Sequence, residues 1–560
     1  MADIAHWSAI LVLVLFLLSN ATVIIPAQIL IPKPLLRLLT SVLVCIRFQS
    51  PINPSLKRAY IHLNFITVPL TSVLILLATR AIDGTVVRNG IVGADGVQPL
   101  DIMALFMSLA YLSISLDATG LLRFLAFWVA RKGGSSGQKL YAYLYIFFLL
   151  CGVVVGNDPV ILSGTAFLAY FTRVSGITPP TAWIFAQFAA ANMASVVLVS
   201  SNPTNLVLSG AFSLKFTTYT AHCILPFLAA AILVYPVLVL MLFRSPALIP
   251  PSFDLHLDEN DGIGATLVDR NGAIFGSILI AATLVILVST STVGVPVWEV
   301  TVPPAVVMLL RDMYHDWSKY RSTPVRQRSE PLNAAAPLAS VESVNGGVIE
   351  SMELADLSTR SVSPVLTTTP ATICSFVSQV RDRVSAIFPT VTTIAKRLPY
   401  SLLPFAFLMF ILVQALATKG WLELLARWWA AWIRRTGTLG AVGGMGFIAC
   451  MFCNVCGTNI GATIVLARVI QLWIASSHEL DPRTRDGAIY ALALGSNYGA
   501  FTLTFSASLA GLLWRQILRQ KGIRVQSIQF LRLNLPVAFT AMLSSSAVLV
   551  GQLYVLYGNQ

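Results

Sequence analysis

The chain has 560 residues, of which 56% are hydrophobic and only 11% are charged. A soluble protein could not cover so much apolar material, so the composition excludes the soluble globular classes. The formal net charge of +13 does not indicate a nucleic-acid partner, because the basic residues are scattered through short loops, where they orient membrane helices. The sequence therefore predicts an all-α, multi-pass integral membrane protein and leaves open which membrane holds it.

The first apolar run, 9–31, predicts a spanning helix; it lacks the basic start and small-residue cleavage site of a removed signal peptide. The loop at 33–58 is basic and has no acidic residue, which predicts a cytoplasmic position within an N-terminal region, 1–60. Further runs near the length that a bilayer requires also predict helices. They lie at 61–79, 100–117, 220–243, 272–290, 399–417 and 533–556.

Residues 61–244 form the first predicted transport unit. A lysine and an arginine bracket 140–171, so both ends of this segment are expected on the inner side. We interpret it as a re-entrant hairpin whose tip, 156–159, stops near mid-membrane. The next helix, 182–214, is interrupted at 200–205 and is expected to emerge outside.

A polar linker at 245–271 follows, and 272–311 begins the second unit. The segment 312–397 is rich in Ser, Thr, Pro and charge, which predicts a disordered cytoplasmic insertion that is either a passive linker or a phosphorylation target. The second unit resumes at 398–560. Its interrupted helix, 487–514, precedes a basic segment and is expected to end inside.

The two units are copies of one sequence at a spacing of about 300 residues. Matching segments are 115–131 with 415–431, 155–162 with 456–463, and 200–208 with 495–503. Because the interrupted helix ends outside in one copy and inside in the other, we predict two inverted repeats, each with a re-entrant hairpin and a broken helix. Such repeats enclose the binding site of many secondary transporters.

Each copy also contains an amphipathic segment, at 119–131 and 420–435. Leu and Trp recur there at helical spacing together with Arg, a composition typical of the membrane interface. We interpret both segments as lateral arms that join a scaffold to a moving part.

The four interruptions form the candidate binding site. Unwound turns inside a membrane free backbone groups, which side chains, ions, water or solute must satisfy, and helix N-termini there attract anions. The alternative is a set of ordinary helix kinks, but four interruptions in duplicated order favour a site. The candidate solute- and ion-binding residues are Asn157, Asp158, Ser201, Asn202, Thr204, Asn205, Thr458, Asn459, Ser496 and Asn497.

Asp158 is the one carboxylate among these residues. An acid at this depth is costly, which indicates either a proton carrier or a Na⁺ ligand. Asp117 and Glu299 lie near predicted helix ends and are expected at the membrane interface.

Three cysteines form a C-x-x-C-x-x-C pattern before the second hairpin tip: Cys450, Cys453 and Cys456. Thiolates bind soft metals, but buried cysteine more often acts as a small apolar residue. No metal or other cofactor is therefore expected, and these residues are only weak candidates.

The segments "VVVGNDPVILSGTAFLAYFTR", "VSSNPTNLVLSGAF", "CNVCGTNIGATIVLARVIQ" and "LGSNYGAFTLTFSASLAGLLWRQILRQKGI" resemble the arsenical pump membrane protein and Na⁺/H⁺ antiporter branch of the ion transporter superfamily. That superfamily also contains citrate and dicarboxylate carriers. The resemblance covers about 100–243 and 399–550. It implies inverted repeats, a homodimer with an elevator-like motion, and hairpin-tip ligands at Asn157, Asp158, Thr458 and Asn459, with Asn202 and Asn497 in the broken helices.

These observations predict a secondary active transporter of a small anion or an oxyacid such as arsenite, coupled to H⁺ through Asp158, with Na⁺ as the other candidate ion. The alternatives are a citrate or dicarboxylate carrier and a Na⁺/H⁺ antiporter. Gly-Asn-Asp and Gly-Thr-Asn replace the Ser-Asn-Thr tips typical of dicarboxylate carriers, which argues against that substrate. An enzyme or receptor is not expected, because no catalytic or nucleotide-binding motif occurs. The expected partners are the solute and the lipid bilayer.

Overall fold

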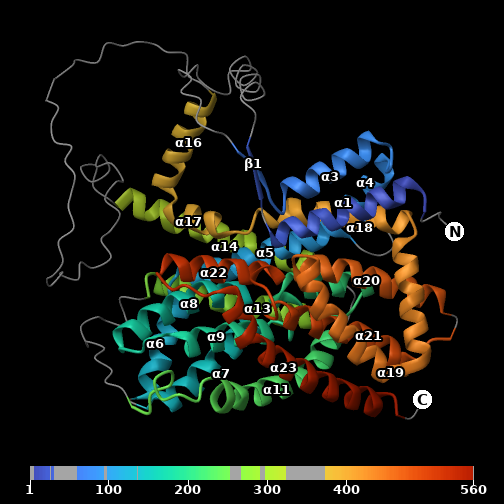
Figure 1. Cartoon of the computed structure of the whole chain (residues 1–560). Coiled ribbons are helices and arrows are strands. Elements are labelled where there is room, and N and C mark those ends of the chain that lie inside the picture. The colour runs from blue at the N-terminus through green and yellow to red at the C-terminus, as the bar shows by residue number, and fades with distance from the viewer. Residues whose placement is uncertain are drawn as a thin grey trace. The chain divides into compact units, whose positions relative to one another are not determined.

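The computed structural model describes residues 5–25, 27–30, 60–93, 98–134, 136–252, 267–290, 295, 297–322, 373–477 and 479–558. This part of the chain is almost entirely helical (Figure 1). Its strands are β1 (Ala27–Leu30) and β2 (Tyr60–Leu63), which pair antiparallel with Ala27 opposite Leu63. Nine helical segments of the described residues are long and apolar enough to cross a bilayer, which confirms an all-α, multi-pass membrane protein.

The chain divides into two compact units. The smaller unit comprises 31–59 and 313–392. Its described parts are the end of α14 (Val297–Ser322), α16 (Ile373–Ile387) and the start of α17 (Pro389–Arg397). Within it, the Asp316 carboxylate accepts hydrogen bonds from the backbone N–H groups of Thr390 at 2.8 Å and Val391 at 3.1 Å. An acceptor at this end stabilises the first turn of α17.

Every other described residue belongs to the larger unit, which holds the two copies. The first copy consists of α5 (Pro99–Ala118), α6 (Leu121–Gly133), α7 (Gly137–Val155), α8 (Asn157–Val174), α9 (Thr181–Ala194), η1 (Val199–Ser201), α10 (Pro203–Phe212), α11 (Phe216–Pro236) and η2 (Val237–Leu242). The second copy consists of α18 (Leu402–Thr418), α19 (Trp421–Val455), α20 (Asn459–Ser476), α21 (Pro482–Gly499), η3 (Phe505–Ala507), α22 (Leu509–Gln520) and α23 (Ser527–Leu556). The larger unit also holds α1 (Trp7–Ile24) of the N-terminal region, α3 (Thr67–Ala78) and α4 (Gly84–Val92) ahead of α5, and α13 (Arg270–Thr290) ahead of α18.

Two predictions about local structure are wrong. Disorder is contradicted at the described ends of the insertion 312–397, where 312–322 and 373–397 are helical apart from Phe388, because packing of residues such as the fully buried Ile394 supplies order that the composition did not indicate. The apolar run 61–79 forms only the short helix α3, since the residues before it pair as β2. The centre of the insertion, most of the linker at 245–271 and the basic loop at 33–58 lie outside the described residues.

Glycines with positive φ occur at matching places in the two copies and support the duplication. They interrupt the chain before the arm, after the arm and at the hairpin tip. In the second copy, α19 is accordingly two helices that meet at a non-helical glycine. The φ values are 87° at Gly120 and 81° at Gly420, 61° at Gly134 and 59° at Gly437, and 92° at Gly156 and 66° at Gly457. The inversion of the copies relative to a membrane stays a prediction.

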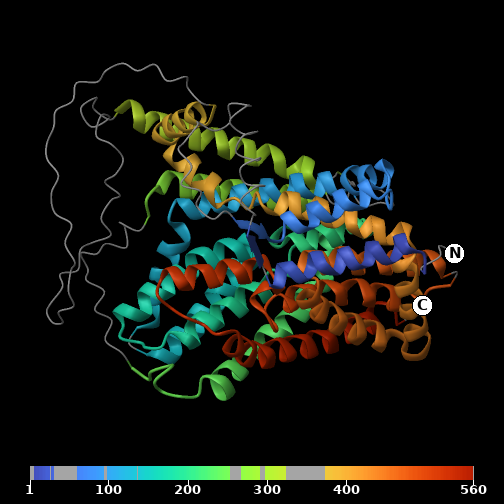
Figure 2. The same cartoon turned by 45° about the horizontal axis from the view of Figure 1, so that its top comes forward.

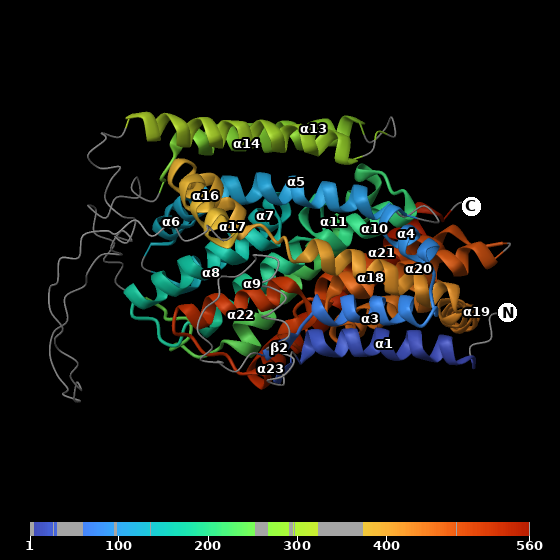
Figure 3. The ribbon, with the colours of Figure 1, turned by 90° about the horizontal axis from the view of Figure 1, so that it is seen from above.

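Where the two copies meet, helices of one copy pack against helices of the other. Helix α8, the second leg of the first hairpin, packs against α22 of the second copy (Figure 2). Helix α20, the second leg of the other hairpin, packs against α10 of the first copy. Each hairpin therefore touches the broken helix of the opposite copy. Outside this crossing, α1, α3 and α18 lie side by side (Figure 3).

The two hairpin tips depend on close backbone approach. A Cβ atom on Gly156 would lie 2.8 Å from the carbonyl oxygen of Ser201, in the first broken helix. A Cβ atom on Gly457 would overlap the side chain of Val23 in α1 and lie 3.0 Å from the carbonyl oxygen of Asn20. Because both glycines also have positive φ, a side chain at either tip is opposed by backbone strain and by steric overlap.

We expect Gly457→Ala to destabilise the protein. Left-handed backbone costs a non-glycine residue about 1–2 kcal/mol, and overpacking against α1 adds about 1–3 kcal/mol. The measurement is the midpoint of thermal unfolding of the purified protein in detergent. The matched control is Gly443→Ala, since Gly443 lies inside helix α19 with nothing within 4 Å of an added Cβ. Equal midpoints for the two variants would contradict this account of the tip.

Candidate functional site

The first broken helix is formed by α9 and α10, with η1 between them. Asn-Pro favours the start of a helix, because the Asn side chain caps it and the Pro ring suits its first turn. Asn202 is accordingly the N-cap of α10, and its side-chain oxygen accepts from the backbone N–H of Thr204 at 3.1 Å. Asn205 donates to the carbonyl oxygens of Ser195, at 2.6 Å, and Leu198, at 2.8 Å. These side chains thus satisfy backbone groups that the break leaves open.

The second broken helix is formed by α21 and α22, with η3 between them. Here Ser508 is the N-cap, and its hydroxyl accepts from the N–H of Gly511 at 3.0 Å and donates to the carbonyl of Ala500 at 3.0 Å. Asn454, at the end of α19, accepts from the N–H of Thr504 at 3.1 Å. Ser508 and Asn454 were not among the predicted site residues, although a serine before an apolar helical run is a recognisable cap signal.

The two broken helices meet through their amides. The Asn202 amide donates to the side-chain oxygen of Asn497 at 2.9 Å, and the Asn497 amide donates to that of Asn205 at 2.8 Å. Ser195 adds a hydroxyl bond to Asn497 at 3.0 Å. We call Ser195, Asn202, Asn205 and Asn497 the amide joint. All four residues are at most 3% exposed.

The amide joint corrects one detail of the repeat alignment. The sequence pairs Asn202 with Asn497 as equivalent positions. In the structure, Asn202 begins the helix after one break, whereas Asn497 lies in the helix before the other break. The N-cap equivalent to Asn202 is therefore Ser508, and Asn202 and Asn497 are contact partners.

Three further candidates also bond within the protein. The Thr204 hydroxyl donates to the side-chain oxygen of Asn202 at 3.0 Å. The Ser201 hydroxyl donates to the carbonyl of Val153 in the hairpin leg α7, at 2.5 Å. The Ser496 hydroxyl donates within its own helix, to the carbonyl of Ala493. These residues support the breaks rather than line open space.

At the first hairpin tip, Asn157 and Asp158 occupy the first turn of α8. The Asn157 amide donates to the side-chain oxygen of Asn192 in α9 at 3.3 Å, which ties the tip to the first broken helix. Asp158 differs, because its carboxylate has no hydrogen-bond or ion-pair partner among the described residues. It lies at a helix N-terminus, where a negative charge is stabilised.

The second tip repeats this pattern with a neutral group. Thr458 is the N-cap of α20, and its hydroxyl accepts from the N–H of Gly461 at 3.1 Å. Asn459 matches Asp158 in the repeat. Its side chain is buried, and within the described part of the chain it too has no hydrogen-bond partner. Of the ten candidates, Asp158 and Asn459 are the two whose side chains have no such partner.

The cysteines behave as packing residues. Cys450 donates weakly to the carbonyl of Gly495 at 3.3 Å, and Cys453 donates to that of Ser496 at 3.6 Å. Both contacts fasten α19 to α21. Across the described residues, no group of three His, Cys, Asp or Glu side chains could hold a metal ion, so the weak ligand interpretation of Cys450, Cys453 and Cys456 has no support.

Asp117 is a buried charge that the sequence analysis placed at the membrane interface. It does end α5, but it is only 6% exposed. Its carboxylate accepts from the Ser163 hydroxyl of α8 and from the Arg397 guanidinium at 3.2 Å. The sequence does carry a signal for this role. The second copy has Ala417 at the position that matches Asp117, so the acid is specific to the first copy. The Ser163 hydrogen bond therefore ties α5 to α8, the leg of the first hairpin that begins at Asn157.

We expect the Asp117 and Arg397 variants to be energetically coupled. Asp117→Asn leaves a partly buried cation without its partner and should cost about 2 kcal/mol, discounted because Arg397 is 35% exposed. The double variant with Arg397→Gln should be less destabilised than the sum of the single variants by about 1 kcal/mol. Thermal unfolding in detergent measures this cycle.

The control cycle uses Arg381 and Asp382, which are both more than two thirds exposed and should show no coupling. Strict additivity at Asp117 and Arg397 would show that the ion pair contributes nothing to stability.

Two solved transporters align with nearly the whole chain at low similarity. The Alcanivorax borkumensis YdaH transporter has a TM-score of 0.49 and 15% identity, over 98% of this chain and 99% of that one. Neisseria gonorrhoeae MtrF has a TM-score of 0.46 and 12% identity, over 97% of this chain and 93% of that one. At these scores neither likeness supports a conclusion.

Curated relatives match a limited region. Arsenical pump membrane proteins of Escherichia coli are 31% identical over 156 residues and 29% identical over 154 residues. The protein of the same description from Yersinia enterocolitica is 29% identical over 156 residues. These matches cover 27–28% of this chain. The chain in turn spans only 35–36% of the length of each relative, about a third.

Two family models cover complementary parts of the chain. The citrate transporter model matches residues 7–325, and the arsenical pump membrane protein model matches residues 362–556. The first match extends over more than half of the 560 residues. This protein therefore belongs to the citrate transporter family, in the ion transporter superfamily that also includes the arsenical pump membrane proteins.

Proposed function

We propose that the protein is a secondary active transporter that moves a small anion or an oxyacid and couples this movement to protons through Asp158. Family membership supports membrane transport of a solute. The single observation that carries the finer proposal is the pair of matched tip residues, Asp158 and Asn459, whose side chains have no hydrogen-bond partner among the described residues. Polar groups at this depth need a partner, and solute and coupling ion would provide it.

The local electrostatics favour this solute class. Asp158 and Asn459 lie in the first turns of α8 and α20, where the helix dipoles favour negative charge. An ionised Asp158 repels an anion, and a protonated Asp158 does not. Binding of a proton to Asp158 therefore raises the affinity for an anion, and by linkage binding of an anion raises the affinity for the proton. A neutral oxyacid such as arsenite would instead use the amide and hydroxyl groups as hydrogen-bond partners.

A citrate-type organic anion is the second candidate substrate. The observation in its favour is the citrate transporter match over residues 7–325. Na⁺ is the second candidate coupling ion, because a carboxylate without a protein partner can also bind a cation. A Na⁺/H⁺ antiporter would use the same Asp158 without any anion.

We expect Asp158→Asn to abolish accumulation driven by a pH gradient, because the amide cannot release a proton. The experiment uses sealed proteoliposomes and labelled arsenite, silicate, citrate and Na⁺, each with and without an imposed pH gradient. The initial rate of gradient-driven uptake of one solute should fall at least about tenfold, a barrier change of about 1.4 kcal/mol, while solute exchange without a gradient persists.

The matched control is Glu423→Gln, which removes an exposed acid on the second arm and should transport normally. Wild-type accumulation by Asp158→Asn would refute proton coupling through this residue. Transport that responds only to a Na⁺ gradient would replace the proton with Na⁺, and movement of Na⁺ alone would favour the antiporter.

We expect Asn459→Leu to weaken solute binding without unfolding the protein, because this side chain makes no hydrogen bond within the described protein. The half-saturating solute concentration should rise about tenfold, which is about 1.4 kcal/mol of binding energy. Asn497→Leu is the contrasting variant: it breaks the amide joint, and about 1–3 kcal/mol of stability should be lost. Thermal unfolding and transport, measured on both variants, separate the two roles. A similar loss of stability in both would contradict this distinction.

A further inference from the structure

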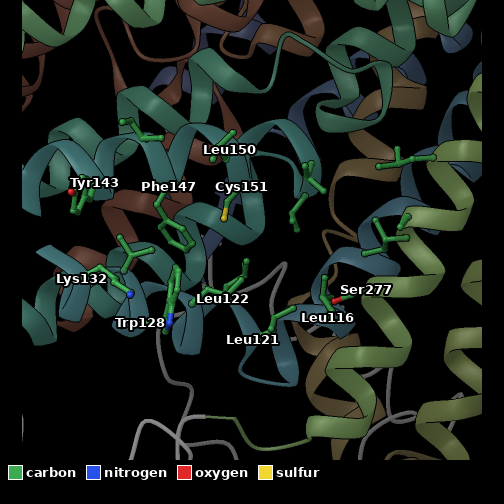
Figure 4. A pocket seen from close by; sticks show the side chains of 18 residues that line it. Leu116, Leu121, Leu122, Trp128, Lys132, Tyr143, Phe147, Leu150, Cys151 and Ser277 are labelled. Carbon is green, nitrogen blue, oxygen red and sulfur yellow. The ribbon is translucent and has the colours of Figure 1, made fainter.

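A deep apolar groove lies away from the hairpin tips, between the first arm and α13. Its volume is about 770 Å³. Side chains of α6, α7 and α13 form most of its walls, including Trp128, Leu150 and Ile280. Figure 4 shows Lys132 and Tyr143 at one side of the groove and Ser277 at the other. The wall thus joins an arm and a hairpin leg of the first copy with helix α13, at the start of the second unit.

The groove opens toward the surroundings of the protein. Leu150 is 63% exposed, Ile146 52% and Trp128 51%, although all three are large and apolar. In a membrane such side chains face lipid tails. Because these tails are equally apolar, the exposure has no hydrophobic cost. Lipids exchange freely over a flat apolar face. A concave apolar groove of this size instead holds a lipid acyl chain in one place.

The groove also carries a cation, Lys132, that has no ion pair among the described residues. Lys132 is the one charged residue in its lining, and its ammonium lies 5.7 Å from the ring centre of Trp128. No Asp or Glu occurs from Ala118 to Asn157, which covers the whole arm and α7, while Arg123, Arg131 and Lys139 add three more cations. Trp beside Lys is typical of the depth at which lipid headgroups lie, and basic residues there attract anionic lipids.

We propose that this groove is a binding site for one anionic phospholipid. One acyl chain lies along the apolar walls of α6, α7 and α13, and the phosphate group pairs with Lys132. The size fits: at about 30 Å³ for each methylene-sized group, the volume holds roughly 25 such groups, enough for one acyl chain and part of a second. This inference does not depend on the proposed transport function.

The test measures lipids that stay with the protein. The full chain is purified in detergent, equilibrated with equal amounts of dioleoyl phosphatidylglycerol and dioleoyl phosphatidylcholine, and analysed by native mass spectrometry. Phosphatidylglycerol should be retained at least about fivefold over phosphatidylcholine. Lys132→Glu should reduce that retention at least about fivefold. Ala281→Trp, which fills the groove from α13, should abolish retention of both lipids.

Matched controls separate the site from general effects. Arg435→Glu makes the same charge change at the matching place of the second arm, and Ala282→Trp adds the same bulk beside the groove but outside its lining. Both should retain phosphatidylglycerol like the wild type, and all variants should elute as the wild type in size-exclusion chromatography. Equal retention of the two lipids, or retention that survives Ala281→Trp, would overturn the proposal. So would tighter retention of free oleate, or a dimer that Ala281→Trp dissociates.

Discussion

The constraint on which the structure depends is that backbone groups freed inside an apolar interior must find partners. The two broken helices free such groups near the centre of the larger unit. Asn205 satisfies two carbonyls of the first break, and Ser508 and Asn454 satisfy groups of the second. Neutral amides and hydroxyls suit this task, because each can donate and accept without the desolvation cost of a charge. The same chemistry then joins the copies, since Asn497 bonds to Asn202 and Asn205.

This constraint divides the polar residues into two groups. One group is committed to the fold, and its bonds link the breaks, the first hairpin tip and the two copies. The other group consists of Asp158 and Asn459, which occupy matching places and whose side chains have no hydrogen-bond partner in the described chain. Polarity alone does not separate the groups, because both are rich in asparagine. The hydrogen-bond partners of each amide do separate them. Residues with partners in the protein stabilise the fold, and residues without such partners are available to a solute.

The positions of the interruptions could be predicted from sequence, because Gly, Asn and Pro signal caps and breaks locally. Asn202 and Thr458 are N-caps for that reason. Partners across the fold could not be predicted. Asn202 and Asn497 look equivalent in sequence yet bond to each other, and Asp117 finds Arg397 in a segment whose composition suggested disorder. Local signals fix where helices stop, whereas long-range packing decides which side chains meet.

The contact of Gly457 with α1 makes the two tips unequal. The first tip rests on Ser201, a part of its own copy, while the second rests on a helix that has no counterpart in the duplication. A side chain added at the second tip would meet Val23 of α1, whereas one added at the first tip would meet Ser201 of η1. The duplication is therefore incomplete at its tips, because the amino-terminal helix supports one of them and leaves the other to its own copy.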